Sequence, residues 1–173
     1  AAYKLLELDD RFHFLKAGIR VVDLGAAPGA WCQVASARIG TAEGGPGLVI
    51  GVDILEMENM NGVELMQLDM REPDAPDIIR SAANGPVDLV VSDLAPSTTG
   101  HGSTDHIRIV ALVEIGLDFA LSVLVPGGTF VAKVFKGGAE GEILDLLKAN
   151  FNTVKHAKPA SSRPESAETY VVA

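Results

Sequence analysis

A glycine-containing loop near the start of the chain is the first pattern with chemical meaning. Residues 21–31 read V-V-D-L-G-A-A-P-G-A-W, an apolar run followed by two glycines and the beginning of a helical pattern. Gly25 and Gly29 let the backbone turn sharply and leave space for a ligand where a Cβ would collide. The spacing is not the G-x-G-x-x-G that seats a pyrophosphate, and no Lys-Ser/Thr pair follows as in a triphosphate-binding loop. On its own, such a loop is also typical of a plain tight turn.

Three acidic residues, Asp23, Asp53 and Asp69, lie at the ends of predicted strands. The carboxyl ends of parallel strands converge on one rim of a sheet. Asp53 is placed to accept both hydroxyls of a ribose and Asp69 to accept the exocyclic amine of adenine, although each could instead cap a turn or helix. With a loop that lacks phosphate-binding features, they favour an adenosine ligand without phosphates, namely S-adenosylmethionine. Trp31 either lines this pocket or belongs to the core, and Cys32 is expected to be a small buried hydrophobe.

The apolar periodicity alternates between strand and helix along the whole chain. It predicts helices over 2–16, 29–39, 74–83, 105–124 and 140–150. It predicts strands over 19–24, 48–53, 63–68, 87–92, 129–135, 153–156 and 169–172. Repeated βα units indicate an α/β fold with a mostly parallel seven-stranded sheet and helices on both faces. Only a loop separates the last two strands, which allows an antiparallel edge strand.

Length and composition set bounds on the class of protein. The 173 residues, with 47% hydrophobic and 21% charged content, suit one domain spanning residues 1–173. The single cysteine excludes an internal disulfide, and there is no membrane-spanning stretch or signal-peptide pattern, so we expect a cytoplasmic protein. The net charge of −9 opposes a nucleic-acid partner unless basic residues gather locally. Residues 133–163 do gather them, although a solvated face is an equally good interpretation.

Seven stretches, taken in order, carry a family resemblance. They are A-A-Y-K-L-L-E-L at the start, D-L-G-A-A-P-G-A-W, G-V-D, the L-D step at 68–69, S-D-L-A-P, P-G-G-T-F-V-A-K-V-F, and K-P-x-x-S-S-R-x-x-S-x-E-x-Y-V-V-A at the end. Over essentially its whole length the chain resembles the FtsJ-like RNA ribose 2′-O-methyltransferases, and within them the bacterial branch that methylates a uridine of 23S ribosomal RNA. The resemblance implies a Rossmann-like class I methyltransferase fold, S-adenosylmethionine as cofactor, and no metal.

The resemblance also implies a catalytic tetrad and a set of cofactor contacts. The tetrad falls on Lys4, Asp93, Lys133 and Glu168. The family's cofactor contacts, with the first glycine of the loop added from its position, fall on Gly25, Gly29, Trp31, Asp53, Asp69 and Asp93. Two departures from the family pattern, at Ala30 and Ser97, leave the tetrad intact.

The chemistry of methyl transfer gives such a tetrad a purpose. A ribose hydroxyl is a poor nucleophile at neutral pH, and a lysine whose pKa falls to about 7–8 can act as its general base. We expect Lys133 to be that base, with Lys4 as the neighbouring cation and with Asp93 and Glu168 orienting both ammonium groups. From the residues alone, however, an exposed strand lysine is the better interpretation of Lys133, because burying an unpaired ammonium is costly.

The expected partner is RNA, within the large ribosomal subunit, bound by a monomeric protein. Four basic residues near the active site are hypothesised to hold RNA phosphates: Lys136, Lys155, Lys158 and Arg163. The alternatives are a transfer-RNA methyltransferase of the same family, a small-molecule methyltransferase, and a non-catalytic cofactor-binding assembly factor. The missing G-x-G-x-x-G disfavours a dehydrogenase.

Overall fold

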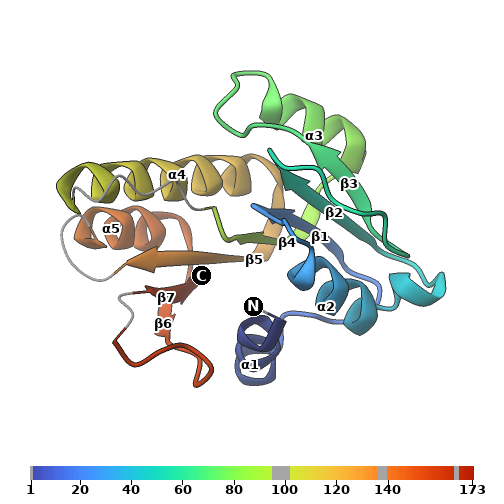
Figure 1. Ribbon diagram of the computed structural model, residues 1–173, viewed down its shortest axis with the longest axis horizontal. Coiled ribbons are helices and arrows are strands. Elements are labelled where there is room, and N and C mark those ends of the chain that lie inside the picture. Colours follow the sequence, from blue (N-terminus) through green and yellow to red (C-terminus); the bar gives the residue numbers. More distant parts are fainter. Residues whose placement is uncertain (1, 95–101, 136–139, 166–167) are drawn as a thin grey trace.

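A seven-stranded sheet forms the centre of the molecule (Figure 1). The computed structural model describes residues 2–94, 102–135, 140–165 and 168–173. The strands lie in the order β3-β2-β1-β4-β5-β7-β6, with β7 antiparallel to both of its neighbours and the other pairs parallel. They are β1 (Arg20–Leu24), β2 (Leu48–Asp53), β3 (Glu64–Gln67), β4 (Val87–Ser92), β5 (Leu124–Phe135), β6 (Lys155–Ala157) and β7 (Glu168–Val172). The mostly parallel sheet with an antiparallel edge is confirmed.

Helices cover both faces of the sheet, as the sequence predicts. One face packs against α1 (Ala2–Phe12) and α2 (Ala30–Ile39), and a short 3-10 helix, η1 (Thr41–Glu43), follows α2. The other face packs against α3 (Ala75–Ala83), α4 (Gly102–Val123) and α5 (Glu140–Asn150). Alternate residues of each strand supply the two cores, because successive side chains point to opposite faces. In β1, for example, Val21 packs toward α1 and α2, whereas Val22 packs toward the other helices.

Several element boundaries differ from the predicted ones. The helix predicted over 2–16 ends at Phe12, because His13 adopts a positive φ of 56° and the carboxylate of Asp9 accepts the N–H of Leu15 at 2.7 Å. This side-chain bond competes with continuation of the helix. The strand predicted to begin at Thr129 begins at Leu124, with a register shift against β4. The helix α4 begins at Gly102, three residues before the predicted start.

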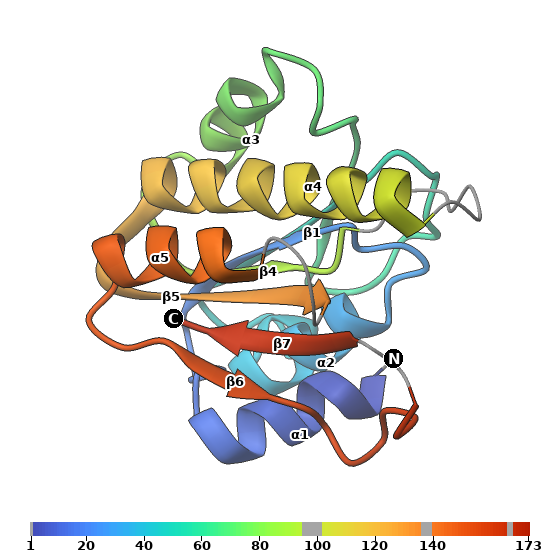
Figure 2. The ribbon, with the colours of Figure 1, turned by 90° about the vertical axis from the view of Figure 1, so that its left-hand side faces the viewer.

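The sheet register explains which residues meet at the edge of the sheet formed by the carboxyl ends of its parallel strands. The parallel strands β1, β2, β4 and β5 all end there, and β7 begins there because it runs the opposite way. Glu168, the first residue of β7, pairs with Phe135 at the end of β5. Figure 2 shows the N-terminal end of α1 and the start of β7 at this same edge. No helix in the described part of the chain has the length and apolar character needed to cross a membrane.

Candidate active site

Four ionisable side chains from four separate elements meet at this edge. The Lys133 ammonium lies 3.1 Å from Oδ1 of Asp93 and 3.8 Å from Oε1 of Glu168. The other carboxylate oxygen of Glu168, Oε2, lies 3.3 Å from Nζ of Lys4. Glu168 therefore joins the two lysines, which come from α1 and β5, and Asp93 follows β4. The structure brings together all four residues that the family resemblance implied as a tetrad.

Lys133 is a buried lysine with ionic partners. Its strand neighbours Ala132 and Val134 pack toward α4 and α5, so Lys133 points toward the face covered by α1 and α2, beside Tyr170 of β7. The residue is 9% exposed. The interpretation of Lys133 as an exposed strand lysine is therefore wrong, and its ammonium satisfies the physical requirement that a buried charge be paired.

Burial dominates the electrostatics of the carboxylate facing Lys133. It raises the pKa of Asp93 above its ordinary value, and the ammonium of Lys133 opposes that rise. The nearby Glu168 carboxylate adds to it. Two ammonium and two carboxylate groups make the cluster neutral when all four are ionised, so the site can hold several charges in a small volume without a net charge.

The glycine loop lies directly against the tetrad. Gly25 has a φ of +77°, and a Cβ there would lie 3.0 Å from backbone atoms of Asp93 and Leu94. The N–H groups of Gly25 and Ala26 both donate to the carbonyl of Val52, at 2.8 and 3.0 Å, which ties the loop to the end of β2. This position needs glycine both for its backbone conformation and for the close approach of two strand ends.

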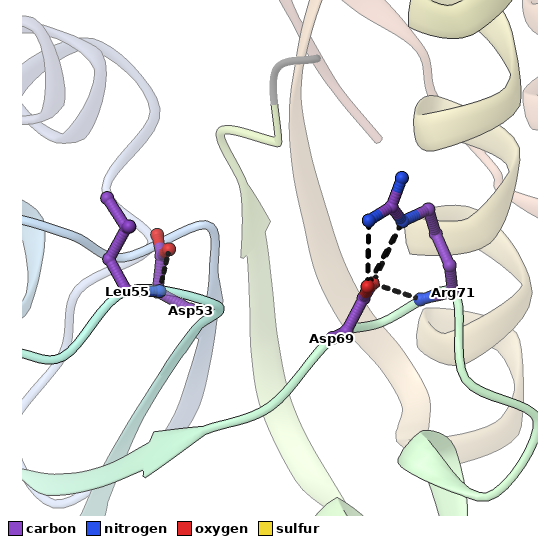
Figure 3. Close-up of polar contacts among 4 residues, drawn as sticks. All are labelled: Asp53, Leu55, Asp69 and Arg71. Atoms are coloured by element: carbon purple, nitrogen blue, oxygen red, sulfur yellow. Dashed lines mark hydrogen bonds and ion pairs between the residues drawn. The ribbon is translucent and has the colours of Figure 1, made fainter. Parts of the chain in front are cut away.

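Asp53 and Asp69 both cap turns. Asp53 Oδ1 accepts the N–H of Leu55 and Oδ2 accepts that of Ala27, each at 2.9 Å. Asp69 accepts the N–H of Arg71 at 2.9 Å and also faces the Arg71 guanidinium, which lowers the pKa of Asp69 (Figure 3). The capping alternative is therefore present at both residues. It leaves further acceptor capacity, because each carboxylate oxygen has a second lone pair.

Asp23 lies beneath this edge rather than on its surface. Its Oδ2 accepts the thiol of Cys32 at 3.2 Å, while Oδ1 is buried and has no hydrogen-bond partner among the described residues. Burial raises the pKa of Asp23 to about 8, and the carboxylates of Asp93 and Asp53 contribute to that rise. Sequence reasoning placed Asp23 near the site and Cys32 in the core, but it missed the bond between them.

Trp31 belongs to the core. The residue is 4% exposed, and its ring lies 5.6 Å from that of Tyr170, measured between centroids. Tyr170 pairs with Lys133 across the β5–β7 ladder, so the indole packs against the residue that lies opposite the buried lysine.

A recess and a groove lie at the two opposite ends of the strands. The recess, of about 430 Å³, adjoins the tetrad and is lined by Lys4, Arg163, Glu165 and Glu168. The larger groove, of about 1030 Å³, lies where β5 begins, and no tetrad residue lines it. The smaller recess, rather than the larger groove, therefore belongs to the candidate active site, because two tetrad residues line it.

The basic residues expected near the recess do not all lie there. Arg163 lines it, and Lys158 donates to the carbonyl of Pro164 at 3.1 Å on the same segment. Lys155 lines the distant groove, so the expectation that it flanks the active site is wrong. The reason is the register: Lys155 pairs with Val172, four residues along β7 from Glu168. Lys136 lies outside the described residues.

Comparison with known proteins agrees with this geometry. The strand order, the antiparallel edge and the glycine loop after β1 define a Rossmann-like methyltransferase. The family model of the FtsJ-like methyltransferases matches residues 1–173. The chain belongs to this family, and it is a methyltransferase.

Named relatives extend the comparison. The chain is 59% identical over 174 residues to ribosomal RNA large subunit methyltransferase E of Paramagnetospirillum magneticum, covering 100% of this chain and 71% of the relative. It is 57% identical to the protein of that name from Rhodopseudomonas palustris strain BisB18, with coverages of 100% and 72%.

Solved structures with the same fold are also known. A Plasmodium falciparum protein described as a ribosomal RNA methyltransferase superposes with a TM-score of 0.86 at 27% identity, covering 99% of this chain and 94% of that one. Human methyltransferase-like protein 13, in complex with SAH, gives a TM-score of 0.63 at 15% identity, covering 99% and 78%. The second likeness concerns the fold alone.

Proposed function

We propose that this protein transfers a methyl group from S-adenosylmethionine to a ribose 2′-hydroxyl of large-subunit ribosomal RNA. The observation that carries the proposal is the buried Lys133 ammonium held between Asp93 and Glu168, with Lys4 on the far side of Glu168. The relatives named as ribosomal RNA large subunit methyltransferases support the choice of substrate.

The residues of the glycine loop suit the proposed cofactor. The loop offers no room for a side chain at Gly25, and its acidic neighbours repel phosphate but accept hydroxyl and amine donors. Asp53 would accept the ribose hydroxyls of the cofactor and Asp69 the adenine amine. The rim carboxylates of Asp53 and Asp69 also suit a ligand that carries positive charge. When bound, the cofactor supplies an electrophilic methyl carbon on a sulfonium.

The tetrad would then act on the acceptor hydroxyl. In its neutral amine form, Nζ of Lys133 receives the hydroxyl proton as the ribose oxygen attacks the methyl carbon, and Asp93 fixes the direction of that amine. Glu168 lies between Lys133 and Lys4, so one carboxylate positions both lysine side chains beside the acceptor hydroxyl. A positioned base of this kind accelerates a reaction about 10²- to 10⁴-fold. Holding the two reactants in line supplies the larger share of the acceleration, about 7–11 kcal/mol.

Lys133→Ala tests the assignment of the base. We expect transfer of a labelled methyl group to large ribosomal subunits to fall about 10²- to 10⁴-fold. Cofactor affinity measured by calorimetry should change little, because Lys133 contacts the tetrad rather than the glycine loop. Lys148→Ala, an exposed lysine on α5, is the matched control. Wild-type turnover in Lys133→Ala would remove Lys133 from the mechanism.

Parallel reactions on three substrates test the choice of RNA. Intact large subunits, naked ribosomal RNA and transfer RNA are incubated with labelled cofactor, and the modified ribose is mapped. We expect one ribose of the large-subunit RNA to carry the label. Label in transfer RNA alone would favour the transfer-RNA branch of the family, and cofactor binding without any transfer would favour an assembly factor.

A further inference from the structure

Tyr3 is an aromatic side chain in an unusual place. It is 72% exposed, and in the part of the chain that the structure describes it is the only exposed residue among Phe, Tyr and Trp. The apolar face of α1 is already formed by Leu5 and Leu8, which are buried, so packing does not need Tyr3. A single exposed apolar residue is ordinary on a protein surface. Tyr3 is distinguished by its position beside the tetrad.

The next residue in the chain ties Tyr3 to the active site. Lys4 is ion-paired with Glu168 at 3.3 Å and lines the recess beside the tetrad. The N-terminal end of α1, which carries both residues, lies at the same edge as the start of β7 (Figure 2). The backbone of Tyr3 is thus fixed next to the catalytic cluster by an interaction that its neighbour makes.

The helix geometry turns Tyr3 toward the loop that forms the other wall of the recess. Residues four apart lie on the same face of a helix. The residue four positions after Tyr3 is Glu7, whose Oε2 accepts the backbone N–H of Ser161 at 3.2 Å. Ser161 precedes Arg163 and Glu165, which line the recess. Tyr3 therefore stands on the face of α1 that looks toward this loop, at the rim of the recess.

The recess lacks a surface on which a nucleobase could stack. Every residue that lines it is charged, so it can bind hydroxyls and phosphates but offers no flat apolar surface to a nucleobase. Proteins that bind unpaired RNA commonly stack its bases on exposed aromatic rings, and enzymes that modify nucleotides draw the target out of its stack.

We propose that the ring of Tyr3 stacks on the base of the acceptor nucleotide while its ribose enters the charged recess. This inference rests on the proposed function, because it assumes an RNA acceptor. It makes Tyr3 a substrate-binding residue that positions the 2′-hydroxyl for Lys133. Since every base has a π face, Tyr3 contributes affinity and orientation with little choice among bases.

Substitutions of Tyr3 test the proposal. Loss of one stacked base costs roughly 5- to 150-fold in binding. We expect Tyr3→Leu to lower kcat/KM for large subunits by that factor through KM, to leave cofactor affinity unchanged, and to be rescued in Tyr3→Phe and Tyr3→Trp. Leu121→Ala, an exposed apolar residue at the opposite edge, is the control and should change nothing.

A substrate with an abasic acceptor nucleotide separates stacking from a structural role. On large subunits reconstituted with that RNA, we expect wild type and Tyr3→Leu to have equal kcat/KM, because the stacking partner is gone. A penalty that persists on the abasic substrate, or that disappears only when a neighbouring nucleotide is abasic, overturns the inference. Equal kcat/KM of Tyr3→Leu and wild type on the normal substrate overturns it alone. Failure of the wild type to methylate any RNA overturns the proposed function as well.

Discussion

Lys133 shows how a single residue can be misjudged from its sequence and still be the centre of a site. An isolated lysine in an apolar strand is expected to point into solvent. Here the side chain is buried, and its ammonium lies within ion-pair range of Asp93 and Glu168. Lys4 is in turn paired with Glu168. Removing one partner of such a buried pair leaves an uncompensated charge, which is costly. The tetrad is therefore expected to respond as a unit to mutation.

Glu168→Gln is the sharpest test of that unity. Glu168 connects the two lysines, so its neutralisation should separate Lys4 from Lys133 and lower the single-turnover methylation rate by about tenfold, less than Lys133→Ala does. Lys4→Met should have a similar effect. In the double variant the two losses should not add, because they break the same contact. Additive losses would mean that Lys4 and Glu168 act independently.

Asp23→Asn tests the buried carboxyl group through the pH dependence of stability. The pKa of Asp23 rises from 3.8 to about 8 on folding, so between these values the folded protein holds a proton that the unfolded chain has lost. The free energy of unfolding therefore decreases as the pH rises through this window. The variant should lack this decrease and gain on the order of 1–4 kcal/mol relative to wild type between pH 5 and pH 8.

Urea unfolding of the cofactor-free protein at the two pH values measures this difference. Asp74→Asn, an exposed carboxylate before α3, serves as the control and should follow the wild-type curve. Parallel pH profiles for wild type and Asp23→Asn would mean that Asp23 is ionised in the folded protein.

At the scale of elements, the glycine loop and the segment after β4 form one structural unit. Gly25→Ala would strain a backbone with a φ of +77° and would push a Cβ against Asp93 and Leu94. We expect a loss of stability of about 1 kcal/mol or more and a lower kcat, because Asp93 is displaced from Lys133.

A matched glycine isolates the effect of the close approach. Gly40 ends α2 with a φ of +98°, and a Cβ there would meet nothing within 4 Å. Gly40→Ala should therefore lose stability through backbone strain alone and retain full methylation activity per folded molecule. If the two variants have the same kcat, the contact between the loop and Asp93 has no role in positioning the carboxylate.

The sequence predicts which elements form, because hydrophobic periodicity indicates them. It predicts their ends and their pairing less well, because these depend on individual side-chain contacts and on strand register. Every strand and helix exists, since hydrophobic alternation directly reflects burial on a two-faced sheet. The early end of α1 depends on Asp9 bonding to Leu15, and the place of Lys155 depends on the register of β6 against β7. Neither is visible in a local pattern.

The site shows the same division. Its four charged residues are far apart in sequence, and only the family resemblance grouped them. Residue types alone do not determine which side chains bond to each other. Examples are the hydrogen bond between Asp23 and Cys32 and the ion pair between Asp69 and Arg71. Burial of Lys133 could not be inferred without knowing that β7 would lie against β5.

For the whole molecule, the distribution of charge matters more than its sum. A net charge of −9 repels RNA, so a few well-placed cations must offset it where RNA docks. Arg163 lines the recess, whereas Lys155 lines the groove at the opposite edge. These two residues offer a direct comparison.

Salt dependence separates their roles. Arg163→Gln should reduce the slope of log affinity against log salt concentration by about one, the signature of one lost phosphate contact. Lys155→Gln should leave the slope unchanged. Filter binding of ribosomal RNA over a range of salt concentrations measures both. A smaller slope for Lys155→Gln would place RNA on the far side of the sheet as well.

The pairing of Lys4 with Glu168 spans 164 residues of sequence, which has a consequence for biosynthesis. During translation, α1 leaves the ribosome long before β7, so the glycine loop is synthesised well before the second carboxylate of the tetrad. Each newly made molecule therefore lacks the complete tetrad until β7 takes its place between β5 and β6.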